Sequence, residues 1–320
     1  MKKFIETLKN CWKIEDLRKR LLVTILFTAI YRFGSFIVLP GINPGLLEKL
    51  QSQTAGGLMS LLDMFSGGAF SKASIFALGI MPYISASIVM QLLAVAVPYF
   101  QKMQREGESG HKKINWYTRV LTIFILLFQA PAYLINLKTQ AAGALATGVN
   151  WTVFMISASI ILAAGSMFIL WLGERITDKG VGNGVSIIIM VGIIARLPQA
   201  FFQEVSSRFT AITSGGLVMF IAEIIILYLV VCAAILLTQG TRKIPVQYAK
   251  KVVGNKQYGG ARQYIPLKLF AANVMPIIFA QALMFIPLAI VQYSTDSASP
   301  VLQSLMDTKS LLYNAIYVVL

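Results

Sequence analysis

The chain contains a series of apolar runs, each about as long as a helix needs to cross a lipid bilayer. About 20 apolar residues span a hydrocarbon core of ~30 Å as an α-helix. The runs cover residues 21–39, 74–98, 120–137, 151–171, 185–202, 217–237 and 269–291, with a partial eighth at 311–320. Hydrophobic residues make up 57% of the chain and charged residues only 13%, which excludes an ordinary soluble enzyme. The runs therefore predict an all-α, polytopic membrane helix bundle.

Most of the positive charges lie in alternate connections between the runs. The segments before the first run, and between runs two and three, four and five, and six and seven, hold seven, five, two and seven of the 28 Lys and Arg residues. These segments share one side of the membrane if the helices alternate, and the positive-inside rule places that side in the cytoplasm. Residues 1–20 show no cleavable signal, and their apolar residues recur at helical spacing. We expect a cytoplasmic N-terminus with an amphipathic helix on the inner leaflet.

The last run is too short to cross the bilayer. Residues 311–320 would form about 15 Å of helix, which is half of the hydrocarbon core. We expect the natural protein to continue beyond Leu320, so that this chain is C-terminally truncated.

Few side chains in the sequence carry reactive chemistry. His111 is the only histidine, Cys11 and Cys232 are the only cysteines, and no nucleotide-binding loop is present. We expect no enzyme activity, no cofactor and no metal site.

Three ionisable residues fall inside the runs. Arg32 and Arg196 lie toward the outer ends of their runs, where their side chains can snorkel, and Glu223 lies in the sixth run, where the sequence does not identify its partner. The absence of a carboxylate pair speaks against an ion-coupled transporter of small solutes.

Two features permit more than one interpretation. Paired glycines bracket a short apolar segment at 56–70, which is either a movable stopper or an inert interfacial helix. Ile80, Ile84 and Ile88 share one helical face, as do Val185 and Ile189. Such faces either pack against neighbours or form an apolar constriction that blocks ions by dewetting.

Two longer stretches resemble a known family. They are SIFALGIMPYISASIVMQLL at 74–93 and LWLGERITDKGVGNGVSIII at 170–189, accompanied by DMFSGG at 63–68 and GESG at 107–110. Both are similar to signature segments of the SecY family, the channel subunits of the Sec protein translocase.

The resemblance implies a ten-span channel built from two five-helix halves in inverted orientation. Residues 1–20 would form the cytoplasmic N-terminal segment. Residues 21–203 would form the first half, which comprises spans one to five and a plug segment at about 57–70. Residues 204–320 would begin the second half with spans six and seven, a basic cytoplasmic loop at 238–268 and a partial span eight.

The resemblance also implies three sets of functional residues. An aliphatic pore ring would comprise Ile80, Ile84, Val185, Ile189 and Ile278. The plug would include Gly57, Leu61, Leu62, Met64, Phe65, Gly67 and Gly68. A docking loop for ribosome and motor would present Arg242, Lys243, Lys250, Lys251, Lys256 and Arg262. The second, third and seventh runs would form a lateral gate toward lipid.

The function implied is that of a protein-conducting channel subunit in the bacterial cytoplasmic membrane. It would translocate unfolded secretory preproteins and release nascent membrane proteins sideways into the lipid bilayer. The implied partners are the small subunits SecE and SecG, the SecA motor ATPase and the ribosome. An ion-coupled solute transporter and a membrane scaffold or insertase without a pore remain as alternatives.

Overall fold

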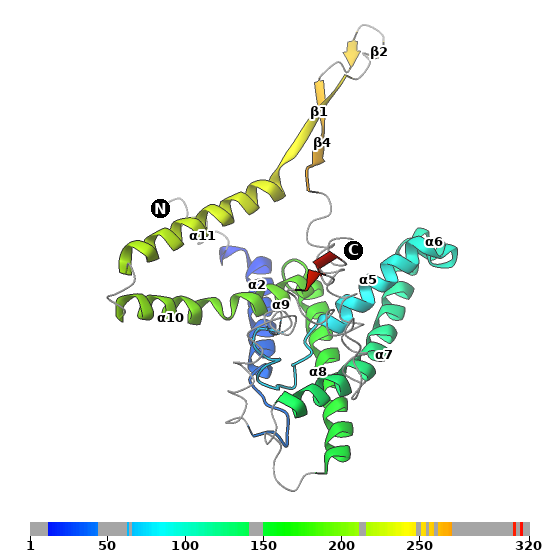
Figure 1. Cartoon of the computed structure of the whole chain (residues 1–320). Helices are drawn as coiled ribbons and strands as arrows, with labels where there is room; N and C mark the ends of the chain where they lie inside the picture. Colours follow the sequence, from blue (N-terminus) through cyan, green and yellow to red (C-terminus); the bar gives the residue numbers. More distant parts are fainter. Residues whose placement is uncertain are drawn as a thin grey trace. The chain divides into compact units, whose positions relative to one another are not determined.

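The computed structural model describes residues 12–43, 63, 66–140, 150–210, 216–247, 251–253, 256–258, 262–270, 310–311 and 314–315. Within these ranges the regular structure consists of long helices and two short antiparallel strand pairs (Figure 1). The chain divides into two compact units, one of Met1–Pro198 with Ile278–Leu320 and one of Gln199–Ile277. Each unit is described by itself.

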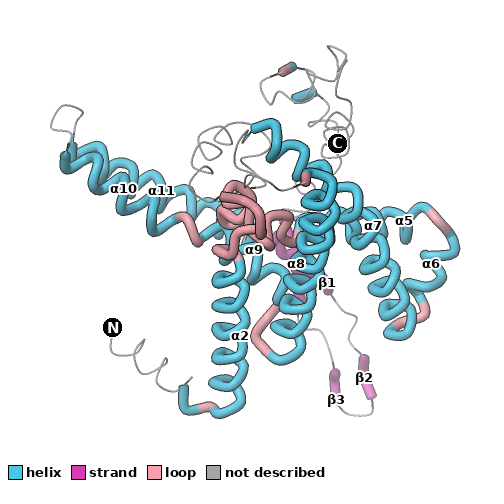
Figure 2. The backbone as a smooth tube through the Cα atoms, turned by 90° about the horizontal axis from the view of Figure 1, so that it is seen from below, coloured by secondary structure: helices cyan, strands magenta, loops and turns pink. Residues whose placement is uncertain are grey.

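The first unit is a helix bundle centred on one long helix. Its helices are α2 (Glu15–Gly34), α5 (Met81–Ala96), α6 (Pro98–Arg105), α7 (Glu108–Gln140), α8 (Trp151–Lys179) and α9 (Gly184–Ile194). Helix α8 packs against α2, α7 and α9, and α5 packs against α7. Figure 2 shows these helices side by side. The bundle agrees with the predicted all-α architecture.

Two hydrophobic clusters form the core of this unit. One lies between α7 and α8 and includes the fully buried Leu126, Leu134 and Leu162. The other, called here the α8–α9 cluster, joins α2, α8 and α9 through buried side chains that include Tyr31 and Ile188. Two residues of the segment before α5 contribute to these clusters. Phe70 belongs to the first cluster and Phe76 to the second, so this segment is part of both.

The first apolar run is helical over only part of its predicted length. Helix α2 ends at Gly34, where the ring of Phe76 occupies the space that a Cβ atom would need. Residues beyond this point bind the segment before α5: Leu39 donates a backbone hydrogen bond to Ala73, and Ile75 donates one to Ile37, both at 2.9 Å. The close contact at Gly34 and this backbone pairing explain why the helix stops short.

The second apolar run also differs from the prediction. Residues 74–80 form turns, and the helix begins only at Met81, with Pro82 in its first turn. Proline fits this position because the first helical N–H groups have no partner within the helix. Pro82 therefore lies in the first turn of α5 without breaking the helix. Pro98 then separates α5 from α6, and the two helices meet at an angle of 98°.

Several helices are long and apolar enough to span a membrane. Within the described residues these are Glu108–Lys138, Trp151–Lys179, Gly184–Ser207 and Met219–Gln239, with the bent α5–α6 pair as a fifth if it is counted as one span. Helix α2 is not among them because residues 17–34 carry four Arg and Lys side chains. The chain is thus a multi-pass membrane protein.

The second unit contains a helix pair and two strand pairs. It contains most of α10 (Leu197–Thr210) and all of α11 (Gly216–Gln239), and the rings of Phe201 and Phe220 on these helices are 5.9 Å apart. Strand β1 (Thr241–Gln247) pairs with β4 (Arg262–Lys268), and β2 (Lys251–Val253) pairs with β3 (Lys256–Tyr258). The basic loop predicted at 238–268 thus forms a β-ribbon at the end of α11 (Figure 1). The seventh run lies outside the described residues.

Candidate functional site: pore constriction and plug anchor

Four of the five predicted pore-ring residues meet in one hydrophobic cluster. Ile80 is buried in the α8–α9 cluster, and Ile84, Val185 and Ile189 pack against it while remaining partly exposed. Ile278 lies outside the described residues. The structure therefore brings together aliphatic side chains that are more than 100 residues apart in the chain.

The start of α5 places its two isoleucines on one face. Ile80 directly precedes the first residue of the helix, and its carbonyl oxygen accepts a hydrogen bond of 3.1 Å from the N–H of Ile84. The helical spacing between the two residues is therefore kept. Ile88, one turn further along, is buried.

Polar contacts fix the start of α9 against α8. The N–H of Gly184 donates to the Thr177 hydroxyl at 2.9 Å, and the Asn183 side chain caps the helix by accepting from the N–H of Ser186 at 3.3 Å. Gly184 also lies so close to α8 that a Cβ atom would be 2.0 Å from the carbonyl oxygen of Gly173. This approach places Val185 and Ile189 in the α8–α9 cluster.

We expect Gly184→Ala to destabilise the bundle. Alanine is the better helix former by up to about 1 kcal/mol, but the added methyl group meets a backbone carbonyl that cannot rotate away. Overpacking of this kind costs about 1–3 kcal/mol, so the net change lowers the free energy of unfolding. The midpoint of thermal unfolding in detergent measures it. The exposed Ser186→Ala on the same helix is the control, and an equal midpoint for both variants would contradict the tight contact.

A compact turn lies at the end of the predicted plug segment. It consists of Asp63 and residues 66–71 and is called here the plug anchor. The backbone oxygen of Asp63 accepts from the Gly68 N–H at 2.9 Å and from the Ser66 hydroxyl at 3.1 Å. Its Oδ1 atom accepts from the Ser71 N–H at 2.9 Å. Asp63 therefore organises the turn through both its backbone and its side chain.

Side chains from three helical regions hold the plug anchor. Arg32 of α2 donates from Nη1 to the carbonyl oxygen of Gly67 at 2.9 Å, and the hydroxyl of Tyr133 of α7 donates to the carbonyl oxygen of Phe70 at 2.8 Å. Arg196, between α9 and α10, forms an ion pair with Asp63. Arg32 and Arg196, the two arginines inside the apolar runs, thus both bind the plug anchor.

The two glycines of the plug anchor give the arginines room. Gly67 has φ +66° and Gly68 has φ +88°, a left-handed region that favours glycine. A Cβ atom on Gly67 would be 2.9 Å from Arg32 Nη1, and one on Gly68 would be 3.1 Å from Arg196 Nη2. The paired glycines thus permit both the turn and the approach of the guanidinium groups.

A third cation lies beside these arginines. The Lys72 Nζ atom is 4.1 Å from the centre of the Phe36 ring, and the Arg32 guanidinium is 5.0 Å from the same centre. Burial lowers the pKa of Lys72, and the charges of Arg32 and Arg196 lower it further while Asp63 opposes them. Three basic side chains and one carboxylate thus lie around the plug anchor.

The Asp63–Arg196 pair could not be identified from the sequence. Its members are 133 positions apart, and Asp63 lies outside the apolar runs. The only usable signal was Arg196 itself, since a charge inside an apolar run is a candidate for function.

The remaining predicted residues are only partly described. Arg242 and Lys243 are exposed on β1, Lys251 and Lys256 lie on β2 and β3, and Arg262 begins β4. The predicted residues outside the described ranges are Gly57, Leu61, Leu62, Met64, Phe65 and Lys250. Where the structure describes the chain, no three His, Cys, Asp or Glu side chains are grouped so that they could hold a metal ion.

Comparison with known proteins links this architecture to one family. A model of the SecY family matches residues 74–320. A protein translocase subunit SecY of Thermotoga maritima is 40% identical over 98% of this chain and 72% of its own length. That of Aquifex aeolicus is 38% identical over 98% of this chain and 73% of its own length.

Solved channels have the same fold. A structure of a protein-conducting channel superposes with a TM-score of 0.56 at 19% identity, covering 86% of this chain and 59% of its own. Sec61 in the canine ribosome–channel complex from the endoplasmic reticulum gives a TM-score of 0.54 at 19% identity, covering 86% of this chain and 60% of its own. The chain thus spans about three fifths of the length of these solved channel chains.

Proposed function

The chain belongs to the SecY family of protein translocase subunits, and we propose that it forms a channel through which unfolded secretory polypeptides cross a bacterial cytoplasmic membrane. Ile80, Ile84, Val185 and Ile189 would line the narrowest part of this channel, together with Ile278. In the same proposal, the segment at about 57–70 is the plug that closes the channel at rest.

One observation carries this proposal: the meeting of aliphatic side chains from α5 and α9 in a single, partly exposed cluster. Flexible aliphatic groups can close on one another when the channel is empty and can surround a moving chain of any sequence. They offer no hydrogen bond that would retain a particular polypeptide, and a narrow apolar passage resists ions by dewetting. A channel with many different substrates needs both properties.

Lateral release of membrane segments would use the face of α5 that packs on α7. Separation of these two helices, together with the seventh run, would open the channel toward lipid. Transfer of a strongly apolar residue into the bilayer is favourable by about 0.3–0.6 kcal/mol. A sufficiently apolar segment would therefore leave the channel sideways without another energy source.

The basic ribbon supports docking of partners on the cytoplasmic side. Arg242 and Lys243 are exposed on β1, and Lys251, Lys256 and Arg262 follow on the other strands. Such a concentration of positive charge attracts the phosphates of ribosomal RNA. The solved canine relative is a ribosome–channel complex, which favours the ribosome as a partner. SecA would supply ATP-driven force at the same surface, and SecE and SecG would complete the membrane complex.

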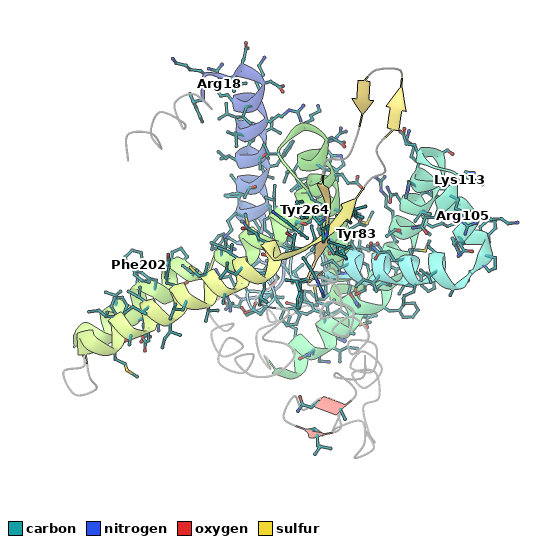
Figure 3. All side chains as sticks on the ribbon, turned by 90° about the horizontal axis from the view of Figure 1, so that it is seen from above. Arg18, Tyr83, Arg105, Lys113, Phe202 and Tyr264 are labelled. Atoms are coloured by element: carbon teal, nitrogen blue, oxygen red, sulfur yellow. The ribbon has the colours of Figure 1, made fainter. Side chains whose placement is uncertain are left out.

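The charge distribution supports a cytoplasmic N-terminus. Arg18 extends from the start of α2, and Arg105 and Lys113 extend from the corner between α6 and α7 (Figure 3). All three residues belong to the connections that the positive-inside rule assigns to the cytoplasm. The ribbon after α11 follows the same alternation.

Transport by reconstituted vesicles tests the proposed function. Vesicles that contain this protein with its translocase partners and SecA should convert a secretory precursor to a protease-protected form when ATP is present. A precursor whose signal sequence carries a charge in its apolar core is the control and should remain accessible to protease. Equal accessibility of the two precursors in active vesicles would contradict the proposal.

A further inference from the structure

We infer that the Asp63–Arg196 ion pair is a clasp that holds the plug anchor against the end of α9, and that channel opening requires the pair to separate. This inference deepens the proposed function and rests on it. The clasp joins the segment that carries the predicted plug to the helix that carries Val185 and Ile189.

Both carboxylate oxygens of Asp63 accept a hydrogen bond. The side chain is only 5% exposed, Oδ1 accepts from the Ser71 N–H at 2.9 Å, and Oδ2 accepts from Arg196. A buried carboxylate is tolerated when it is paired and hydrogen-bonded, and removal of its partner leaves an uncompensated charge. The plug anchor is therefore stable in this position only while Arg196 remains beside it.

The surrounding charges strengthen the dependence. Arg32 donates to the carbonyl oxygen of Gly67 in the same turn, and Lys72 shares the Phe36 ring with Arg32, so three positive groups and one negative group lie around the plug anchor. If Asp63 moved away, these cations would repel one another without a counter-charge. Loss of the pair is thus unfavourable for both sides of the contact.

Two features permit the clasp to open. The Arg196 side chain is 45% exposed, so water can solvate its guanidinium group when the pair separates. Gly67 and Gly68 lie directly beside the contact, and glycine allows the backbone to turn in ways that other residues resist. By contrast, Tyr133 holds Phe70, two residues after Gly68, from within the bundle core. We therefore expect the part before Phe70 to move while Phe70 stays in place.

A double-mutant cycle with Asp63→Asn and Arg196→Gln tests the clasp. Asparagine keeps an acceptor for the Ser71 N–H but loses the charge, and glutamine removes the guanidinium group. We expect each single variant to raise the ion conductance of the resting channel in planar bilayers by about tenfold, as loss of a buried charge pair shifts the closed state. The double variant should be no leakier than the worse single variant, because both changes remove one interaction.

Arg196→Lys separates the charge from the shape of the side chain. Lysine keeps the positive charge, so this variant should leak less than half as much as Arg196→Gln. If the Asp63→Asn protein does not accumulate in the membrane, the comparison of Arg196→Lys with Arg196→Gln tests the clasp instead. Arg196 is partly exposed, so a shorter side chain at this position should not prevent folding. Equal leakage of Arg196→Lys and Arg196→Gln would overturn the clasp.

The exposed Glu108–Lys112 pair, with a distance of 2.9 Å, provides a matched control. Glu108→Gln should leave the conductance within twofold of the unaltered protein, because exposed pairs contribute little. Precursor transport is measured in vesicles from the same preparations. Failure of the unaltered protein to transport would refute the proposed function, whereas normal transport with unchanged leakage in Asp63→Asn and Arg196→Gln would refute the clasp alone.

Discussion

Removal of residues 57–65 should open the resting channel more than any other change considered. The deletion takes away most of the predicted plug and also Asp63, the counter-charge of Arg196. Loss of the ion pair alone is expected to raise the conductance about tenfold, and removal of the plug itself adds to this effect, since each ~1.4 kcal/mol changes an equilibrium tenfold. We therefore expect the fraction of open channels, measured as ion conductance in planar bilayers without precursor, to rise by at least ~100-fold.

The boundaries of this deletion follow from the packing. Residues 66–70 are buried, and the hydroxyl of Tyr133 binds the carbonyl oxygen of Phe70 inside the bundle. A longer deletion through Phe70 would damage the core as well as the plug. A replacement of 57–62 by an equally long Gly–Ser segment keeps Asp63 and should leak less than the deletion. Leakage of the deletion variant at the level of the unaltered channel would contradict the assignment of this segment as a plug.

Replacement of Ile84 or Ile189 by glycine should raise the ion conductance of the resting channel by about tenfold. Each replacement removes an aliphatic side chain from the constriction, so that water can enter the passage. Glycine costs a helix about 1 kcal/mol relative to alanine, and the lost contacts with the α8–α9 cluster add to this cost, so the midpoint of thermal unfolding of each variant is measured as well. The conductance of single channels in planar bilayers measures the effect. The two replacements together should leak more than either alone, since both widen the same passage.

A matched change on the outside of the bundle controls for the loss of helix stability. Ile160 of α8 is 64% exposed and belongs to neither hydrophobic cluster, so Ile160→Gly should not raise the conductance. Equal conductance for Ile84→Gly, Ile189→Gly and Ile160→Gly would favour a scaffold or insertase without a pore. An ion-coupled solute transporter would instead show solute-dependent currents that these changes abolish.

Helix identity was predictable because lipid leaves the backbone few alternatives. An apolar run in a bilayer must satisfy its own N–H and C=O groups, so each long run becomes a helix. The runs at 120–137, 151–171 and 217–237 lie within α7, α8 and α11 for this reason. The spacing of Ile80 and Ile84, and of Val185 and Ile189, likewise predicted side chains that share a face.

Apart from the break at Pro98, the breaks in the helices were not predictable, because long-range contacts cause them. Helix α2 ends where Phe76 packs on Gly34, and the turns at 74–80 are held by pairing with residues 37–39. Helices α9 and α10 meet at Arg196, which binds Asp63 far away in the chain. The β-ribbon was missed for another reason: its charge pattern predicts a side of the membrane but carries no information on strand pairing.

The path of the polypeptide can be tested most directly by crosslinking. A photoreactive amino acid is placed in this protein at Ile84, Ile189 or Ile160, and a secretory precursor is stalled in the channel by a folded domain at its end. If the aliphatic ring surrounds the moving chain, Ile84 and Ile189 will crosslink to the precursor and Ile160 will not. Adducts at Ile160 with none at Ile84 or Ile189 would show that the polypeptide takes another route.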